Sequence, residues 1–109
     1  MWRVYLYAGD LFRPLDLSWD ELVGLAEDPA ALLERLRTEV EELLGCRVAR
    51  LEPFKAMVSE SGDAVAEYLA VLEGPMASGE ASVKLIHAED PAKALREYYE
   101  WERRAAERR

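Results

Sequence analysis

The chain has 109 residues, which corresponds to one domain of ordinary size. Half of the residues are hydrophobic and a third are charged, a balance typical of globular proteins and unlike that of disordered chains. A single cysteine, Cys46, excludes an internal disulfide and a cysteine-based zinc site, and a single histidine, His87, excludes a multi-histidine metal site within the chain. No apolar run approaches the roughly 20 residues of a membrane span, so we expect a cytoplasmic protein, and the sequence indicates no cofactor.

Acidic residues outnumber basic ones by 22 to 14, which gives a formal net charge of −8. The charges are unevenly distributed, because residues 103–109 hold four arginines and one glutamate. We therefore expect one domain over residues 1–102 and a basic tail over 103–109 that continues the last helix. An acidic body of this kind disfavours nucleic acid and membrane surfaces and suits a basic protein partner.

Asparagine and glutamine are absent, and the charged residues are mostly glutamate and arginine, with only three lysines. Amide side chains are thermolabile, whereas the cost of desolvating ion pairs falls as the temperature rises. The composition indicates a thermophilic source. This source is either a cell, for example an archaeon, or a virus that infects such a cell. The codon bias of a GC-rich genome would produce a similar composition.

Residues 2–8 alternate between two faces, and their β-branched and aromatic side chains predict a strand that ends at Gly9. The next segment, 11–17, contains Pro14 and follows no regular period. Its leucines and phenylalanine indicate a loop that packs against the rest of the protein.

Two helices are predicted next, and each has its own start signal. Residues 18–21 form a capping box, in which the side chains of Ser18 and Glu21 satisfy backbone amides of the first turn. Asp28 and the proline after it start the second helix, whose leucines recur at helical spacing up to its final glycine, Gly45.

Three strands are predicted in the following part of the chain. The first, over 46–60, contains Pro53, which marks a break or bulge, and ends in a hairpin-sized turn. Residues 65–73 fit either a strand or a helix, and we favour the strand because it follows a turn of hairpin length. A turn over 77–80 leads into the third strand, over 81–88.

Asp90 and the proline after it start a last helix. Its inner side is expected to carry Ala94, Leu95, Tyr98, Trp101 and Ala105. The order β-α-α-β-β-β-α predicts an α+β fold, a single two-layer domain with a mostly antiparallel sheet and the helices packed on one face. The core side of the sheet is then expected to carry Trp2, Val4, Leu6, Phe54, Ala56, Val58, Ala81, Val83 and Leu85.

No arrangement typical of catalysis is present, and we expect a protein that is not an enzyme. His87 precedes Glu89 and Asp90, but Asp90 is already used as a helix cap, so we interpret His87 as a satisfied histidine at the end of a strand. Cys46 directly follows the end of a helix, where the dipole disfavours a thiolate, and is interpreted as a buried structural thiol. A small enzyme with a carboxylate-based site stays open as an alternative.

The sheet face turned away from the helices is the most informative feature. Two of the three lysines fall there among aromatic and aliphatic side chains, and a contiguous exposed patch of this kind marks an interaction site. The predicted binding residues are Arg3, Tyr5, Tyr7, Lys55, Met57, Lys84 and Ile86.

Three partners fit this face. The first is a second copy of the chain, which would make the protein a homo-oligomer. The second is a different protein, for which the chain would act as an adaptor or regulator. The third is single-stranded or structured nucleic acid, since aromatic rings stack on bases and lysines meet phosphates, although the acidic body disfavours it. We expect a non-enzymatic protein-interaction module, with self-association favoured.

Overall fold

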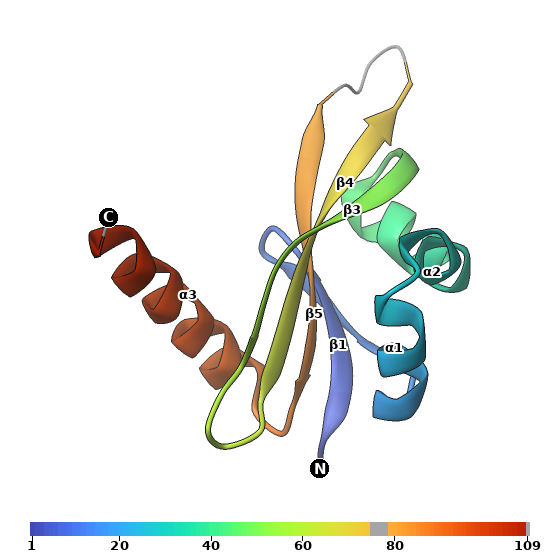
Figure 1. Ribbon diagram of the computed structural model, residues 1–109. Helices are drawn as coiled ribbons and strands as arrows, with labels where there is room; N and C mark the ends of the chain where they lie inside the picture. Colours follow the sequence, from blue (N-terminus) through green and yellow to red (C-terminus); the bar gives the residue numbers. More distant parts are fainter. Residues whose placement is uncertain (75–78, 109) are drawn as a thin grey trace.

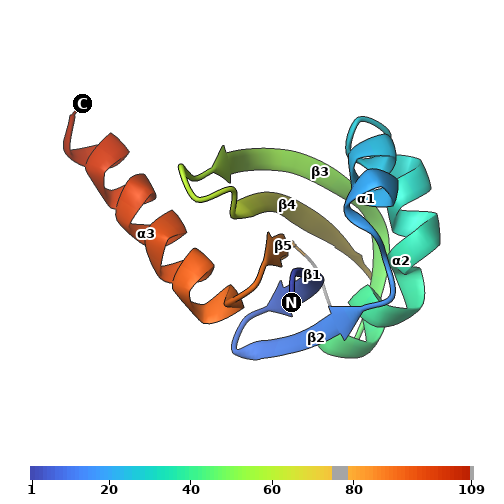
Figure 2. The ribbon, with the colours of Figure 1, turned by 90° about the horizontal axis from the view of Figure 1, so that it is seen from below.

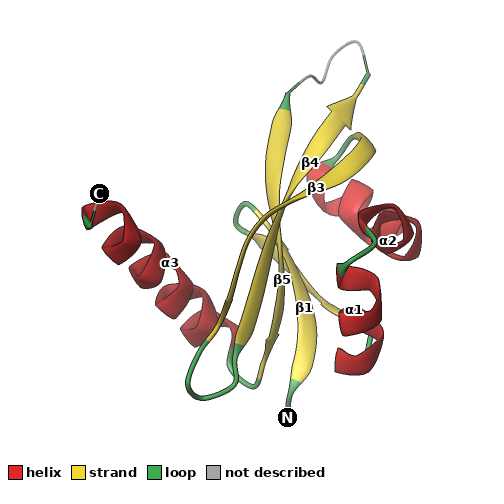
Figure 3. Cartoon of the chain, viewed as in Figure 1, coloured by secondary structure: helices red, strands yellow, loops and turns green. Residues whose placement is uncertain are grey.

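In the part of the chain that the structure describes, one antiparallel sheet of five strands is flanked by three helices (Figures 1 and 3). The elements of this computed structural model, which describes residues 1–74 and 79–108, are β1 (Arg3–Ala8), β2 (Leu11–Leu15), α1 (Trp19–Ala26), α2 (Pro29–Leu44), β3 (Arg47–Val58), β4 (Ala64–Glu73), β5 (Glu80–Ala88) and α3 (Pro91–Glu107). The strands lie side by side in the order β2-β1-β5-β4-β3. The predicted α+β class, the antiparallel sheet and the strand over 65–73 are confirmed. The predicted turn over 77–80 lies partly outside the described residues.

The first two helices begin where the sequence predicts, because side chains cap their first turns. The hydroxyl of Ser18 accepts a hydrogen bond from the backbone N–H of Glu21 at 3.1 Å, and the carboxylate of Asp28 accepts one from the N–H of Ala31 at 3.1 Å. Gly45 ends α2 with a φ of 72°, a left-handed conformation that L side chains rarely adopt. Within the described residues, no helix is both long and apolar enough to cross a membrane.

The segment predicted as a packed loop contains a strand, β2, so this prediction is wrong. Gly9 and Asp10 form a two-residue hairpin between Ala8 and Leu11, with Gly9 in the left-handed region at a φ of 62°. Pro14 is tolerated in β2 because β2 is an edge strand, one side of which needs no ladder hydrogen bonds.

The larger hydrophobic core lies between the sheet and the pair α1–α2, and it is the predicted two-layer core. Apolar side chains recur with a period of two along the strands and with helical spacing along α2, so that both elements bury one face. The central buried residues are Val4, Leu6, Leu32, Leu36, Val40, Val48, Leu51, Val83 and Leu85.

The predicted core is wrong at the end of β3. Phe54, Ala56 and Val58 are all exposed, Val58 to 70%. The register between β3 and β4 shifts between Pro53 and Lys55, so that Phe54 has no partner on β4 and the strand bends there. Trp2, expected in the core, is also exposed.

Helix α3 lies against the opposite face of the sheet from α1 and α2 (Figure 2), so the prediction that the helices pack on one face is wrong for α3. Ala94 and Tyr98 of α3 are fully buried with Val65, Ile86 and Ala88 of the sheet in a second, smaller core. The physical reason is that the outer face carries apolar side chains of its own, and removing this surface from water stabilises the fold.

The second half of α3 extends away from the sheet (Figures 1 and 2). Its buried residues belong to its first half, and Ala105, predicted on the inner side, is exposed. The helix continues to Glu107, through the first residues of the basic tail, whereas Arg109 lies outside the described residues.

Candidate interaction surface

The strand register brings the predicted binding residues to one face of the sheet. Tyr7 lies opposite Lys84, Lys84 lies opposite Glu67, and Glu67 lies opposite Lys55. Opposed residues of antiparallel strands point their side chains to the same side, so this row crosses β1, β5, β4 and β3 on one face. Arg3, at the start of β1, lies on the same face and is exposed.

A second row runs parallel to the first. Tyr5 lies opposite Ile86, Ile86 opposite Val65, and Val65 opposite Met57. Because α3 crosses this row, Ile86 is fully buried and belongs to the core, not to an exposed surface. The predicted patch is thereby divided into a part on β1 and a part on β3.

A buried carboxylate, Glu67, joins α3 to the sheet. It accepts hydrogen bonds from the hydroxyls of Tyr98 at 2.6 Å and Ser82 at 2.8 Å, and it lies 4.0 Å from the ammonium of Lys84. Burial is the main reason that the pKa of Tyr98 is raised, and the hydrogen bond to Glu67 adds to it. Sequence reasoning missed Glu67, whose one signal is its position as the carboxylate in the interior of an apolar strand.

Four aromatic side chains from β1, β2 and α3 form a cluster, here called the aromatic patch: Tyr5, Tyr7, Phe12 and Tyr99. The ring of Phe12 stacks on that of Tyr7, with centroids 5.2 Å apart, and lies 6.4 Å from that of Tyr5. Tyr99 joins them through Lys84, the ladder neighbour of Tyr7, whose ammonium lies 5.4 Å from the Tyr99 ring. Phe12 is 54% exposed and Tyr99 is 50% exposed.

Two members of the aromatic patch were not predicted. Phe12 was missed because β2 reads as a loop in the sequence, and Tyr99 because α3 is expected on the other face. Tyr5 and Tyr7 are predicted members that remain partly exposed. Partial burial raises the pKa of Tyr7, and the neighbouring Tyr5 adds to the shift.

Both lysines of the predicted patch have carboxylate partners. Lys55 pairs with Glu102 of α3 at 3.2 Å, and the largely buried Lys84 faces Glu67. Their positive charges are therefore compensated within the chain, and the exposed part of this face is aromatic more than cationic.

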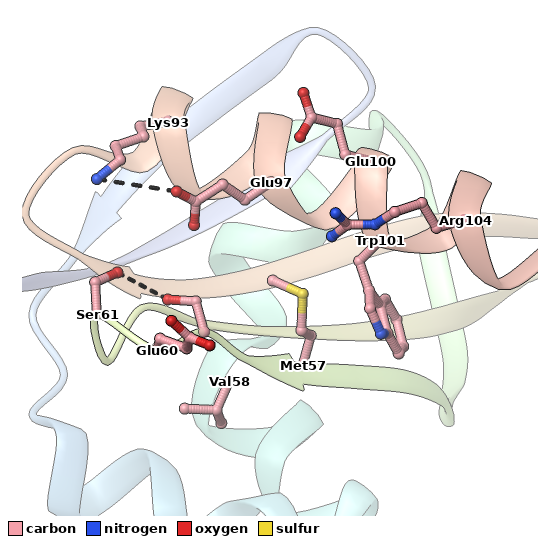
Figure 4. Close-up of a pocket in the computed structure, with 10 residues that line it drawn as sticks. Met57, Val58, Glu60, Ser61, Lys93, Glu97, Glu100, Trp101 and Arg104 are labelled. Atoms are coloured by element: carbon pink, nitrogen blue, oxygen red, sulfur yellow. Dashed lines mark hydrogen bonds and ion pairs between the residues drawn. The ribbon is translucent and has the colours of Figure 1, made fainter.

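A cleft of about 520 Å³ lies on the other side of α3, between this helix and the end of β3 (Figure 4). Met57, a predicted binding residue, and Trp101 supply apolar surface to it. Charged side chains of α3 also line it, among them Lys93 and Glu97, whose charged groups lie 3.9 Å apart. The cleft therefore combines an apolar contact surface with a charged border.

His87 lies between two tryptophans. Its ring is 4.6 Å from that of Trp19, in a stacked arrangement, and 5.3 Å from that of Trp2. Burial lowers the pKa of His87, and the negative charge of Asp63 opposes this shift. Cys46 is a free, partly buried thiol. Over the part of the chain that the structure describes, no group of three or more potential ligand side chains could hold a metal ion.

Comparison with known proteins assigns no family to this fold. No protein-family model, no curated protein and no solved structure matches the chain. A function can thus be inferred only from the chemistry of this chain's own surface.

Proposed function

We propose that this protein is a non-catalytic interaction module that assembles into a homo-oligomer through the aromatic patch. The observation that carries the proposal is the stacked pair Tyr7–Phe12, whose outer ring, Phe12, is more than half exposed. Tyr99, whose ring contacts the ammonium of Lys84, adds a second half-exposed ring. Clustered aromatic side chains supply most of the binding energy in protein interfaces, because their burial removes a large apolar area from water.

The charge around the patch favours a protein partner over nucleic acid. Contacts with a phosphate backbone require lysines or arginines that are available to release counterions. Lys55 and Lys84 instead have carboxylate partners, Glu102 and Glu67, and the chain as a whole carries a net charge of −8.

We further propose that the module works at high temperature. In addition to the absence of amide side chains, ion pairs join separate elements of the fold. Arg35 of α2 pairs with Glu21 of α1 at 3.0 Å, and Lys55 of β3 pairs with Glu102 of α3. The desolvation penalty of such pairs falls with temperature.

The test of self-association compares two neighbours on β2. Phe12→Asp places a charge in the aromatic patch. Leu11→Asp places the same charge on the same strand at a residue that is 56% exposed, but on the opposite face, because Leu11 lies opposite the core residue Ala8. The molar mass in solution is measured by light scattering over a range of protein concentrations.

We expect the unchanged protein and Leu11→Asp to form the same discrete oligomer and Phe12→Asp to stay monomeric at each concentration. A monomeric unchanged protein, or an oligomer that survives Phe12→Asp, would refute self-association through this patch.

A further inference from the structure

The second edge of the sheet, β3, is open along its last residues. Upstream of Lys55 the strand carries Pro53 and two register shifts, features that protect edge strands from pairing with other chains. The last four residues of β3, residues 55–58, pair with β4 without interruption, from Lys55 opposite Glu67 to Val58 opposite Ala64. Their outer side is a regular strand edge, able to accept another strand.

An apolar pocket lies on one side of this edge, between β3, β4 and α1. It has a volume of about 170 Å³, comparable to a large hydrophobic side chain. Trp19 and Val23 of α1 line it together with Ala56 and Val58 of β3. These two β3 residues point to the α1 side, since they lie opposite Ala66 and Ala64, which face α1 as well.

The cleft against α3 lies on the other side of the same edge (Figure 4). Met57 points into it, because side chains of a strand alternate between faces. The border of the cleft carries three carboxylates and two cations. These residues are Glu60, Glu97, Glu100, Lys93 and Arg104.

We propose that the edge of β3 over residues 55–58 binds an extended segment of a partner protein, in which apolar and basic side chains alternate. The added strand continues the sheet by backbone hydrogen bonds, and its alternate side chains enter the two flanking pockets. Apolar side chains enter the pocket at Trp19 and Val23, and basic side chains meet Glu60 and Glu100 at the cleft.

The negative charge of the cleft border and of the whole chain favours a partner with a basic segment. The charged residues at the border of the cleft carry a net charge of −1, and the chain as a whole carries −8. A basic segment is therefore attracted both locally and at a distance. A second copy of this chain fits less well, because the edge segment it would offer, residues 55–58, carries one lysine and no alternation of basic with apolar side chains. This site lies at the β3 edge of the sheet, whereas Tyr7 and Phe12 of the aromatic patch lie on β1 and on the opposite edge strand, β2. A substitution at Phe12 therefore tests self-association without altering this site.

The experiment uses the whole chain and blocked peptides of about five residues, the length that matches the open edge at about 3.3 Å per residue. One peptide alternates valine with arginine, and a second alternates valine with glutamate. A third has the first sequence with methylated backbone nitrogens, which cannot pair as a strand. Amide chemical shifts in NMR spectra report where and how tightly each peptide binds.

We expect saturable shifts at residues 55–58 with the valine–arginine peptide. Its affinity should exceed that of the valine–glutamate peptide by about tenfold, and methylation should abolish binding. The double variant Glu60→Lys with Glu100→Lys should reverse the preference. Its matched control, Glu73→Lys with Glu80→Lys, makes the same change in net charge at exposed residues outside the cleft lining and should keep the preference.

Three results would overturn this proposal. The first is the absence of shifts at residues 55–58 at peptide concentrations up to about 1 mM. The second is equal binding of the methylated peptide, which would indicate an apolar site without strand addition. The third is a change of the shifts at residues 55–58 with protein concentration in the absence of peptide, which would indicate that a second copy of the chain binds this edge. Phe12→Asp should leave peptide binding unchanged, so failure of self-association and failure of this site are distinguishable.

Discussion

Tyr98 donates a hydrogen bond of 2.6 Å to Glu67, and both side chains are buried between α3 and the sheet. This contact joins the last helix to the fourth strand and explains why a carboxylate is retained in a buried position. A buried carboxylate is tolerated only where donors satisfy it, and the hydroxyls of Tyr98 and Ser82 donate to Glu67. Lys84 donates to Ser82 and places its positive charge 4.0 Å from Glu67. The position of α3, and with it the division of the outer face, depends on this polar cluster as well as on apolar packing.

Replacement of Tyr98 by phenylalanine should therefore destabilise the protein. The variant keeps the ring but leaves one buried oxygen of Glu67 without its donor, which should lower the free energy of unfolding by about 1–3 kcal/mol. Tyr99→Phe is the matched control, since the ring of Tyr99 is half exposed and the change should cost less than about 0.5 kcal/mol. Urea denaturation measures both values. Equal effects of the two changes would show that the hydrogen bond does not hold α3.

Two glycines should respond to alanine in opposite directions. Gly45 ends α2 at a φ of 72°, so Gly45→Ala should lower the free energy of unfolding by about 1 kcal/mol. Gly24 lies inside α1 with open space around it, so Gly24→Ala should raise stability by about 0.4–1 kcal/mol. The same denaturation experiment measures both, and a stabilising Gly45→Ala would contradict the assigned end of α2.

Stability should fall when His87 becomes protonated. In the unfolded chain His87 titrates near pH 6.5, whereas burial lowers its pKa in the folded protein. The unfolded state therefore binds the proton more readily, so this contribution to stability is complete above about pH 6.5 and is lost as the pH falls through the folded pKa. His87→Phe keeps a flat ring between Trp2 and Trp19 and removes the titration. Melting temperatures between about pH 7.5 and pH 5.5 should fall more for the unchanged protein than for the variant, and parallel curves would disprove the effect.

The proposal of a high working temperature has a direct test. Domains from mesophiles melt at about 45–65 °C. Differential scanning calorimetry should give a melting temperature above this range for the unchanged protein. A value within the range would leave codon bias as the explanation of the missing asparagine and glutamine.

Local signals explain why the helices of the first half were predicted well. A cap residue at each start, Ser18 or Asp28, and a glycine at the end of α2 specify these helices within a few neighbouring residues. Strand β2 was missed although Gly9-Asp10 is a hairpin signal, because Pro14 suggested a loop. A proline is tolerated in an edge strand, but whether a segment lies at the edge depends on the order of all strands in the sheet.

The placement of α3 could not be predicted from local patterns. Its apolar stripe fits either face of the sheet, and both faces carry apolar residues, for example Leu85 on one side and Ile86 on the other. The choice between the faces depends on pairs distant in sequence, such as Tyr98 with Glu67. The predicted binding residues share one face as expected, because the alternation of side chains along a strand is a local pattern. The burial of Ile86 was not predicted, because it depends on α3, which was assigned to the other face.

The pairing of β1 with β5 has a consequence for how the chain folds. β1 lies in the interior of the sheet, and its ladder joins Arg3 to Ala88, residues far apart along the chain. Contacts of such long sequence separation carry a large loop-closure entropy and slow the crossing of the folding barrier. The hairpin β3–β4, with a short connection, can form early, whereas the sheet is completed only after β5 has been synthesised. During synthesis on the ribosome, one backbone edge of β1 therefore stays unpaired until β5 has been made.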